Sequence, residues 1–239
     1  MVSIEKLQSC YRLTNSISTL PLGCGEALTD RIVGGNATEA HAIPWQVALV
    51  DSKKCPMLFC GGTIICSNWI MTAAHCNRDS FQVLAQEHKV VGIGSTRYIA
   101  GNGTRHNVKR VIPHPNYNKD TGNNDFMLVE LVEPLSLTGT SKARAACLPT
   151  FSDIQSYTAA GTKFVVSGWG ALKQGGSGPD VLHSAIVPHI SDTVCKLKYP
   201  GRISSQMMCA GHLAGGIDSC QGDSGGKYWQ DILYATRIF

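Results

Sequence analysis

The sequence has little charge and no long apolar run. Charged residues make up 16% of its 239 residues, and 21 Lys and Arg against 17 Asp and Glu give a net charge of +4. No stretch is basic enough to hold phosphates or anionic lipid, so we expect no binding to nucleic acid or to a membrane surface. No apolar run approaches the ~18 residues of a membrane-spanning helix, so we expect no membrane span.

The N-terminal residues lack the apolar core of a signal peptide, because Met1 to Cys10 include Glu5 and Lys6. Ten cysteines are nevertheless typical of an oxidising compartment. The simplest resolution is that upstream sequence precedes this chain or that it starts at an internal methionine. We therefore expect an extracellular protein, secreted or at the cell surface. Sequons at Asn36 and Asn102 are compatible with secretion and glycosylation.

Short β-rich runs dominate the chain after a leader that shows no sustained period. Residues 1–31 form this leader, and from Ile32 onward Gly, Pro and Asn separate runs that recur about every ten residues. This spacing predicts an antiparallel sandwich or barrel with little helix, in two halves linked by the turn-rich stretch 134–150. The expected strands are 45–50, 63–65, 69–72, 81–85, 108–112, 126–131, 164–167 and 181–187.

Three segments carry residue types suited to nucleophilic catalysis: 72–76 (TAAHC), 123–128 (NNDFML) and 218–226 (DSCQGDSGG). A serine hydroxyl is a poor nucleophile until an imidazole removes its proton, and a carboxylate must hold that imidazole in one tautomer. His75, Asp125 and Ser224 supply these three groups. Any chain of this length contains these three residue types, so the evidence for a catalytic role comes from the sequence motifs around them.

The order His, Asp, Ser with these flanking words resembles the trypsin-like serine endopeptidases of the chymotrypsin family. The resemblance covers about residues 24–226 and implies an all-β fold of two packed antiparallel six-stranded β-barrels. In this arrangement the peptidase domain is 32–239, with the first barrel at about 32–135 and the second at about 150–239.

The same resemblance implies a role for each site residue. His75 is the general base, Asp125 orients it, and Ser224 attacks the carbonyl. The backbone amides of Gly222 and Ser224 form the oxyanion hole, in which one donor contributes about 3 kcal/mol. Asp218 at the floor of the specificity pocket, with Ser219 beside it, implies protein or peptide substrates with Arg or Lys before the scissile bond. The alternative for Asp218 is a surface aspartate near a disulfide.

The leader ends in a segment that resembles the activation site of the family, Arg31-Ile32-Val33-Gly34-Gly35. Cleavage after Arg31 by an activating protease would free the Ile32 amino group to pair with the buried carboxylate of Asp223. Without that partner the buried carboxylate would cost ~3–5 kcal/mol, so the uncut chain is expected to be a zymogen with 1–31 as its propeptide. The alternative is that Arg31 is an ordinary exposed arginine. Protein protease inhibitors are expected as further partners.

The family pairing implies three disulfides, Cys60–Cys76, Cys195–Cys209 and Cys24–Cys147, the last of which would tether the leader after cleavage. Four cysteines remain, at positions 10, 55, 66 and 220. Cys55 and Cys66 flank one strand region, but spacing alone leaves their pairing open. The family partner of Cys220 lies after the nucleophile, where this chain has no cysteine.

No metal or other cofactor is expected. None of the remaining histidines has metal-ligand spacing, and we expect them in loops or on the surface, at positions 41, 88, 106, 114, 183, 189 and 212. A calcium loop would need several acidic residues near 87–100, and Glu87 is alone there.

The residues after Gly226 depart from the family pattern. The segment 227–239 matches none of the pocket strands expected there, which predicts a second barrel that is incomplete at the C-terminus, with unpaired strand edges. Two functions therefore compete. The first is an active endopeptidase, and the alternative is a catalytically incompetent truncated homologue that acts at most as a binding protein.

Overall fold

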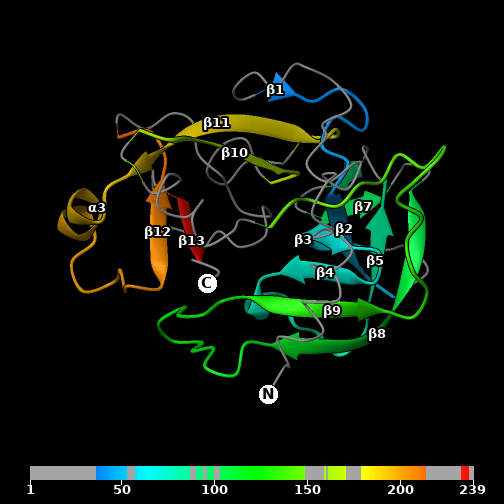
Figure 1. The fold of residues 1–239 in the computed structure, drawn as a ribbon, viewed down its shortest axis with the longest axis horizontal. Coiled ribbons are helices and arrows are strands. Elements are labelled where there is room, and N and C mark those ends of the chain that lie inside the picture. Colours follow the sequence, from blue (N-terminus) through cyan, green and yellow to red (C-terminus); the bar gives the residue numbers. More distant parts are fainter. Residues whose placement is uncertain are drawn as a thin grey trace, which may run out of the picture.

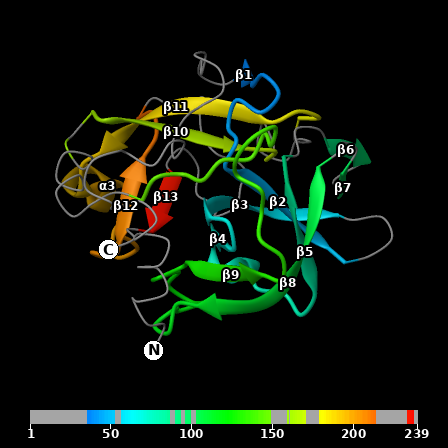
Figure 2. The ribbon, with the colours of Figure 1, turned by 45° about the vertical axis from the view of Figure 1, so that its right-hand side comes forward.

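The computed structural model describes residues 36–52, 57–86, 90–93, 96–99, 103–148, 159, 161–170, 179–213 and 233–236. These residues form β-strands in two halves, with the single α-helix of the described part in the second half (Figures 1 and 2). Among them, no helix is long and apolar enough to cross a membrane.

Six antiparallel strands close the first barrel in the order β2-β3-β4-β9-β8-β5. Closure pairs every strand on both sides, so the barrel has no free edge. Its strands are β2 (Gln46–Asp51), β3 (Leu58–Cys66), β4 (Trp69–Thr72), β5 (Phe81–Ala85), β8 (Thr104–Pro113) and β9 (Met127–Leu131). Outside the barrel, β6 (Val90–Ile93) and β7 (Thr96–Ile99) pair as a two-stranded sheet.

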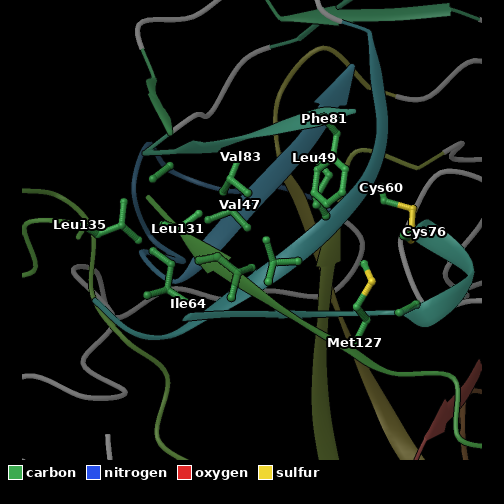
Figure 3. Close-up of a cluster of buried hydrophobic side chains, with 14 of the residues drawn as sticks. Val47, Leu49, Cys60, Ile64, Cys76, Phe81, Val83, Met127, Leu131 and Leu135 are labelled. Atoms are coloured by element: carbon green, nitrogen blue, oxygen red, sulfur yellow. A yellow bond between two sulfur atoms is a disulfide. The ribbon is translucent and has the colours of Figure 1, made fainter. Parts of the chain in front are cut away.

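Strand β2 is buried on both of its faces. Val47 and Leu49 belong to the cluster of apolar side chains inside the barrel (Figure 3). The alternate residues Ala48 and Val50 lie in a second cluster, which also contains Trp169 and Leu182 of the second half. Because successive side chains of a strand point to opposite faces, a continuous apolar run is what this position requires.

In the second half, the described residues form one sheet of five strands. β11 (His183–Ile190) pairs with β1 (Asn36–Ala37), β10 (Lys163–Gly168) and β12 (Met207–Ala210). The helix α3 (Asp192–Lys198) connects β11 to β12. One closed barrel beside a second antiparallel sheet confirms the predicted all-β fold class.

The C-terminal segment departs from the expectation of unpaired edges. β13 (Leu233–Thr236) lies in the tail that matched no family strand, yet it pairs antiparallel with β12 along four residues of each strand. The edge of β12 is therefore covered. The physical reason is that the hydrogen bonds between paired strands use only main-chain groups. A strand can therefore form even where the sequence matches no motif of the family.

One histidine prediction is wrong. His189 lies in β11 with 6% of its surface exposed, and its ring meets Phe164 of β10 edge-on at a centroid distance of 6.2 Å. The sequence placed the end of this strand at residue 187, whereas the strand runs to Ile190. The longer strand carries His189 into the interior of the sheet.

We predict that Gly62→Ala destabilises the barrel. A Cβ atom at Gly62 would lie 2.9 Å from Cγ2 of Ile70 and 3.1 Å from Cγ2 of Val47 and the main-chain oxygen of Met71. Overpacking of this kind lowers the free energy of unfolding by about 1–3 kcal/mol, which urea titration measures. In a Val47→Ala background, which removes one of the close atoms, the added loss should be smaller. An unchanged free energy of unfolding would contradict the predicted crowding.

Candidate active site

His75 lies on a short turn that is attached firmly to the barrel wall. The 3₁₀ helix η1 (Ala74–Cys76) follows β4 directly, and the Cys60–Cys76 disulfide joins it to β3 (Figure 3). Beside it, the buried hydroxyl of Thr72 donates to the main-chain oxygen of Gly61 at 2.7 Å. The backbone of His75 is therefore held between two barrel strands.

Asp125 lies in the loop that leads into β9. The backbone of this loop has an unusual conformation at the preceding residue, which is an asparagine. The preceding residue, Asn124, has a φ of +53°, in the left-handed region that asparagine tolerates better than most residues. The side-chain amide of Asn124 donates to the main-chain oxygen of Asn116 at 3.0 Å, and the main-chain oxygen of Asn124 accepts from the N–H of Phe126 at 2.8 Å. These bonds fix the loop on both sides of the carboxylate.

The Asp125 carboxylate holds His75 at two points. One oxygen accepts the main-chain N–H of His75 at 2.8 Å, and the other lies 2.7 Å from Nδ1 of its ring. The Asp125 side chain is 9% exposed, whereas that of His75 is 32% exposed. A carboxylate can only accept, so Nδ1 carries the proton and the neutral ring leaves Nε2 as an acceptor. The ring of His75 is thus more exposed than the carboxylate that holds it, and its Nε2 lies 3.6 Å from Sγ of Cys76.

Tyr117 is a neighbour of this pair that the sequence did not single out. It packs against the barrel cluster, and burial together with the nearby Asp125 charge raises the pKa of its hydroxyl above the ordinary value of 10.0. It stands eight positions before Asp125 in a loop rich in polar residues, which carries no motif that would mark it.

The remaining predicted site residues lie outside the described residues: Arg31, Ile32, Asp218, Ser219, Gly222, Asp223 and Ser224. So do Cys24 and three of the cysteines without an expected partner, Cys10, Cys55 and Cys220. The Cys195–Cys209 disulfide is present, and Cys66 and Cys147 are disulfide-bonded as well.

One group of side chains in the described residues has the composition of a metal site. Donor atoms of Cys60, His75 and Cys76 lie within 4.8 Å of one another. Both sulfurs are bonded to each other, however, so neither offers the thiolate that a metal needs. This group is not suited to hold a metal ion.

The sequence comparisons agree with this geometry. The family model described as Trypsin matches residues 32–230. The chain is 42% identical to trypsin of Sus scrofa over 82% of this chain and 78% of the relative. It is also 42% identical to serine protease 1 of Canis lupus familiaris, over 82% of this chain and 74% of the relative.

The chain belongs to the trypsin family. Its class is therefore that of serine-type endopeptidases, which are hydrolases. Trypsin of Xenopus laevis is 41% identical over 82% of this chain and 74% of its own length. As a trypsin-family chain, it carries its histidine and aspartate on the closed first barrel, and the family match extends through the segment that contains Ser224.

We predict that Tyr117→Phe reduces the alkaline loss of stability. Because folding raises the pKa of Tyr117, its contribution to stability is complete below pH ~10 and is lost as pH rises through the raised value. The free energy of unfolding of the wild type should therefore fall more steeply between pH 9 and 11 than that of the variant, with these approximate limits set by the usual tyrosine pKa. Urea unfolding across this range measures both slopes, and equal slopes would show that Tyr117 titrates normally.

Proposed function

We propose that this chain hydrolyses peptide bonds after Arg or Lys through an acyl-enzyme on Ser224, and that it is made as a zymogen. The observation that carries the proposal is the two-point contact between Asp125 and His75, which leaves Nε2 as the acceptor. That arrangement supports general-base catalysis, because a base must be fixed in one tautomer before it can take a proton.

The proposed reaction uses His75 twice. Nε2 takes the proton of the Ser224 hydroxyl as its oxygen attacks the carbonyl carbon, and the amides of Gly222 and Ser224 stabilise the negative oxygen that forms. Nε2 then gives the proton to the leaving amine, and the carbon–nitrogen bond breaks. Water repeats the sequence on the acyl-enzyme, which releases the acid and restores Ser224. Throughout, the Asp125 carboxylate orients the ring and stabilises its protonated form.

Specificity and activation are proposed for residues at the two ends of the family match. Asp218 would pair with the cationic side chain of the substrate, and Ser219 would add a hydroxyl acceptor. Cleavage after Arg31 by an activating protease would release the Ile32 amino group to pair with Asp223. Protein protease inhibitors would compete for the same site, in an extracellular setting.

We predict that a fluorophosphonate probe labels Ser224 after cleavage between Arg31 and Ile32. Labelling should disappear in Ser224→Ala and persist in Ser205→Ala, which changes an exposed serine. Asp125→Asn should keep the fold but lower kcat by about 10⁴, the loss typical of this substitution in serine proteases. Absence of labelling in folded, cleaved protein would overturn the proposed enzymatic activity. It would favour the alternative, a catalytically incompetent homologue that acts at most as a binding protein.

We also predict that Asp218→Asn selectively removes activity on basic substrates. The kcat/KM for Arg and Lys esters should fall about a hundredfold or more, since a buried charge that loses its partner costs ~3–5 kcal/mol. The kcat/KM for a Phe ester should change little, which makes this ester the internal control. If Arg, Lys and Phe esters react equally fast with the unaltered enzyme, the assignment of Asp218 is wrong.

A further inference from the structure

A side-chain hydrogen bond joins the two halves of the molecule close to the acidic residue of the candidate site. Ser204 lies in the second half, between α3 and β12, and its hydroxyl donates to the side-chain oxygen of Asn123. Asn123 precedes Asp125 by two residues on the loop between β8 and β9. In Figure 1 this loop, drawn in green, extends from the barrel toward the orange segment that follows α3.

Both partners are held in place by further bonds. The Ser204 hydroxyl also accepts the main-chain N–H of Gln206 at 3.1 Å, in a segment whose ends are joined by the Cys195–Cys209 disulfide. Asn123 in turn donates its main-chain N–H to the Thr121 hydroxyl at 3.3 Å, and its main-chain oxygen accepts from Asn118 at 3.0 Å. The bond therefore connects two pieces of chain that are each held by further hydrogen bonds.

The loop is exposed along part of its length, although Tyr117 near its start packs against the barrel cluster. Four consecutive residues before Gly122 are exposed, at positions 118 to 121, and the N–H groups of Asp120 and Thr121 both donate to the side chain of Asn118 within the loop. Loops of this kind open at lower free energy than packed strands do. A tie at Asn123 acts next to the carboxylate, whereas the bond between Ser167 and Gln46 joins the halves away from this loop.

We propose that Ser204 and Asn123 are positioning residues for Asp125. Their hydrogen bond fixes the loop against the second half, which keeps the carboxylate in register with both the main-chain N–H and Nδ1 of His75. This inference rests on the proposed function for its effect on turnover. The second half thereby takes part in positioning the general base, His75, of the first barrel.

Kinetics of the activated protein test the inference with matched variants. Ser204→Ala removes the donor, Ser204→Thr keeps a hydroxyl, and Ser205→Ala changes the exposed neighbour on the same segment. We expect Ser204→Ala to lower kcat on an Arg ester about tenfold with KM within twofold, because sub-ångström misplacement of a catalytic group acts on the chemical step. Ser204→Thr should restore kcat, and Ser205→Ala should leave it unchanged.

A second measurement does not depend on turnover. The proton NMR resonance of His75 Nδ1–H reports the bond to Asp125 directly, and its assignment follows from its loss in His75→Gln. We expect this proton to exchange with solvent at least about tenfold faster in Ser204→Ala than in the wild type, since opening of the loop exposes it. If the protein hydrolyses nothing, this comparison still tests the positioning role, while the proposed function alone fails.

The outcomes separate a positioning role from a purely structural one. If folded Ser204→Ala keeps both the wild-type exchange rate and the wild-type kcat, the inference is overturned. It is also overturned if kcat falls only in proportion to the unfolded fraction measured by thermal unfolding. Should Ser204→Ala fail to fold, Asn123→Ala removes the same bond from the acceptor side. Folded Asn123→Ala should then show the same faster exchange and lower kcat, and wild-type values of both would overturn the inference.

Discussion

The arrangement of this molecule depends on one carboxylate that contacts both the main chain and the ring of the same histidine. The two oxygens of Asp125 accept the N–H of His75 and lie against its Nδ1, so the position of the backbone and the tautomer of the ring are set together. Neither contact would form without two loops brought from distant parts of the chain. The barrel supplies them, since β4 leads into η1 and the loop after β8 leads into β9, while β4 and β9 are hydrogen-bonded neighbours.

The loops of His75 and Asp125 are held in place by different kinds of bond. A disulfide and a buried hydroxyl bond attach η1 to β3, whereas the loop of Asp125 relies on asparagine side chains and on Ser204 of the other half. The two side chains also differ in burial, because Asp125 is less exposed than the His75 ring that it orients. A covered carboxylate in a hydrogen-bonded environment interacts strongly with the imidazole, while the exposed ring remains accessible to a substrate.

Much of this could be predicted from the sequence, and the failures have physical causes. The strands 69–72 and 81–85 were predicted with their observed bounds, because short apolar runs between turn residues are strong signals. The words around His75 and Asp125 predicted their roles, and the structure brings the two side chains together. Tyr117, Asn123 and Ser204 could not be predicted, because their roles arise from contacts across the fold. The helix α3 was missed since it is short, although Ser191 caps it through a bond from the N–H of Val194. The pairing of β13 was missed because main-chain ladders leave little mark on side-chain identity.

The double burial of β2 has a consequence for how such a chain can change over time. The odd-numbered residues Val47 and Leu49 pack in the barrel interior. The even-numbered residues Ala48 and Val50 pack in the cluster that includes side chains of the second half. The barrel is thus not a self-sufficient module, since cutting it away would leave alternate apolar residues of a central strand in water. If the second half were lost or exchanged during evolution, the residues of β2 that pack against it, such as Ala48 and Val50, would have to be substituted as well. The two halves are therefore expected to be inherited as one unit.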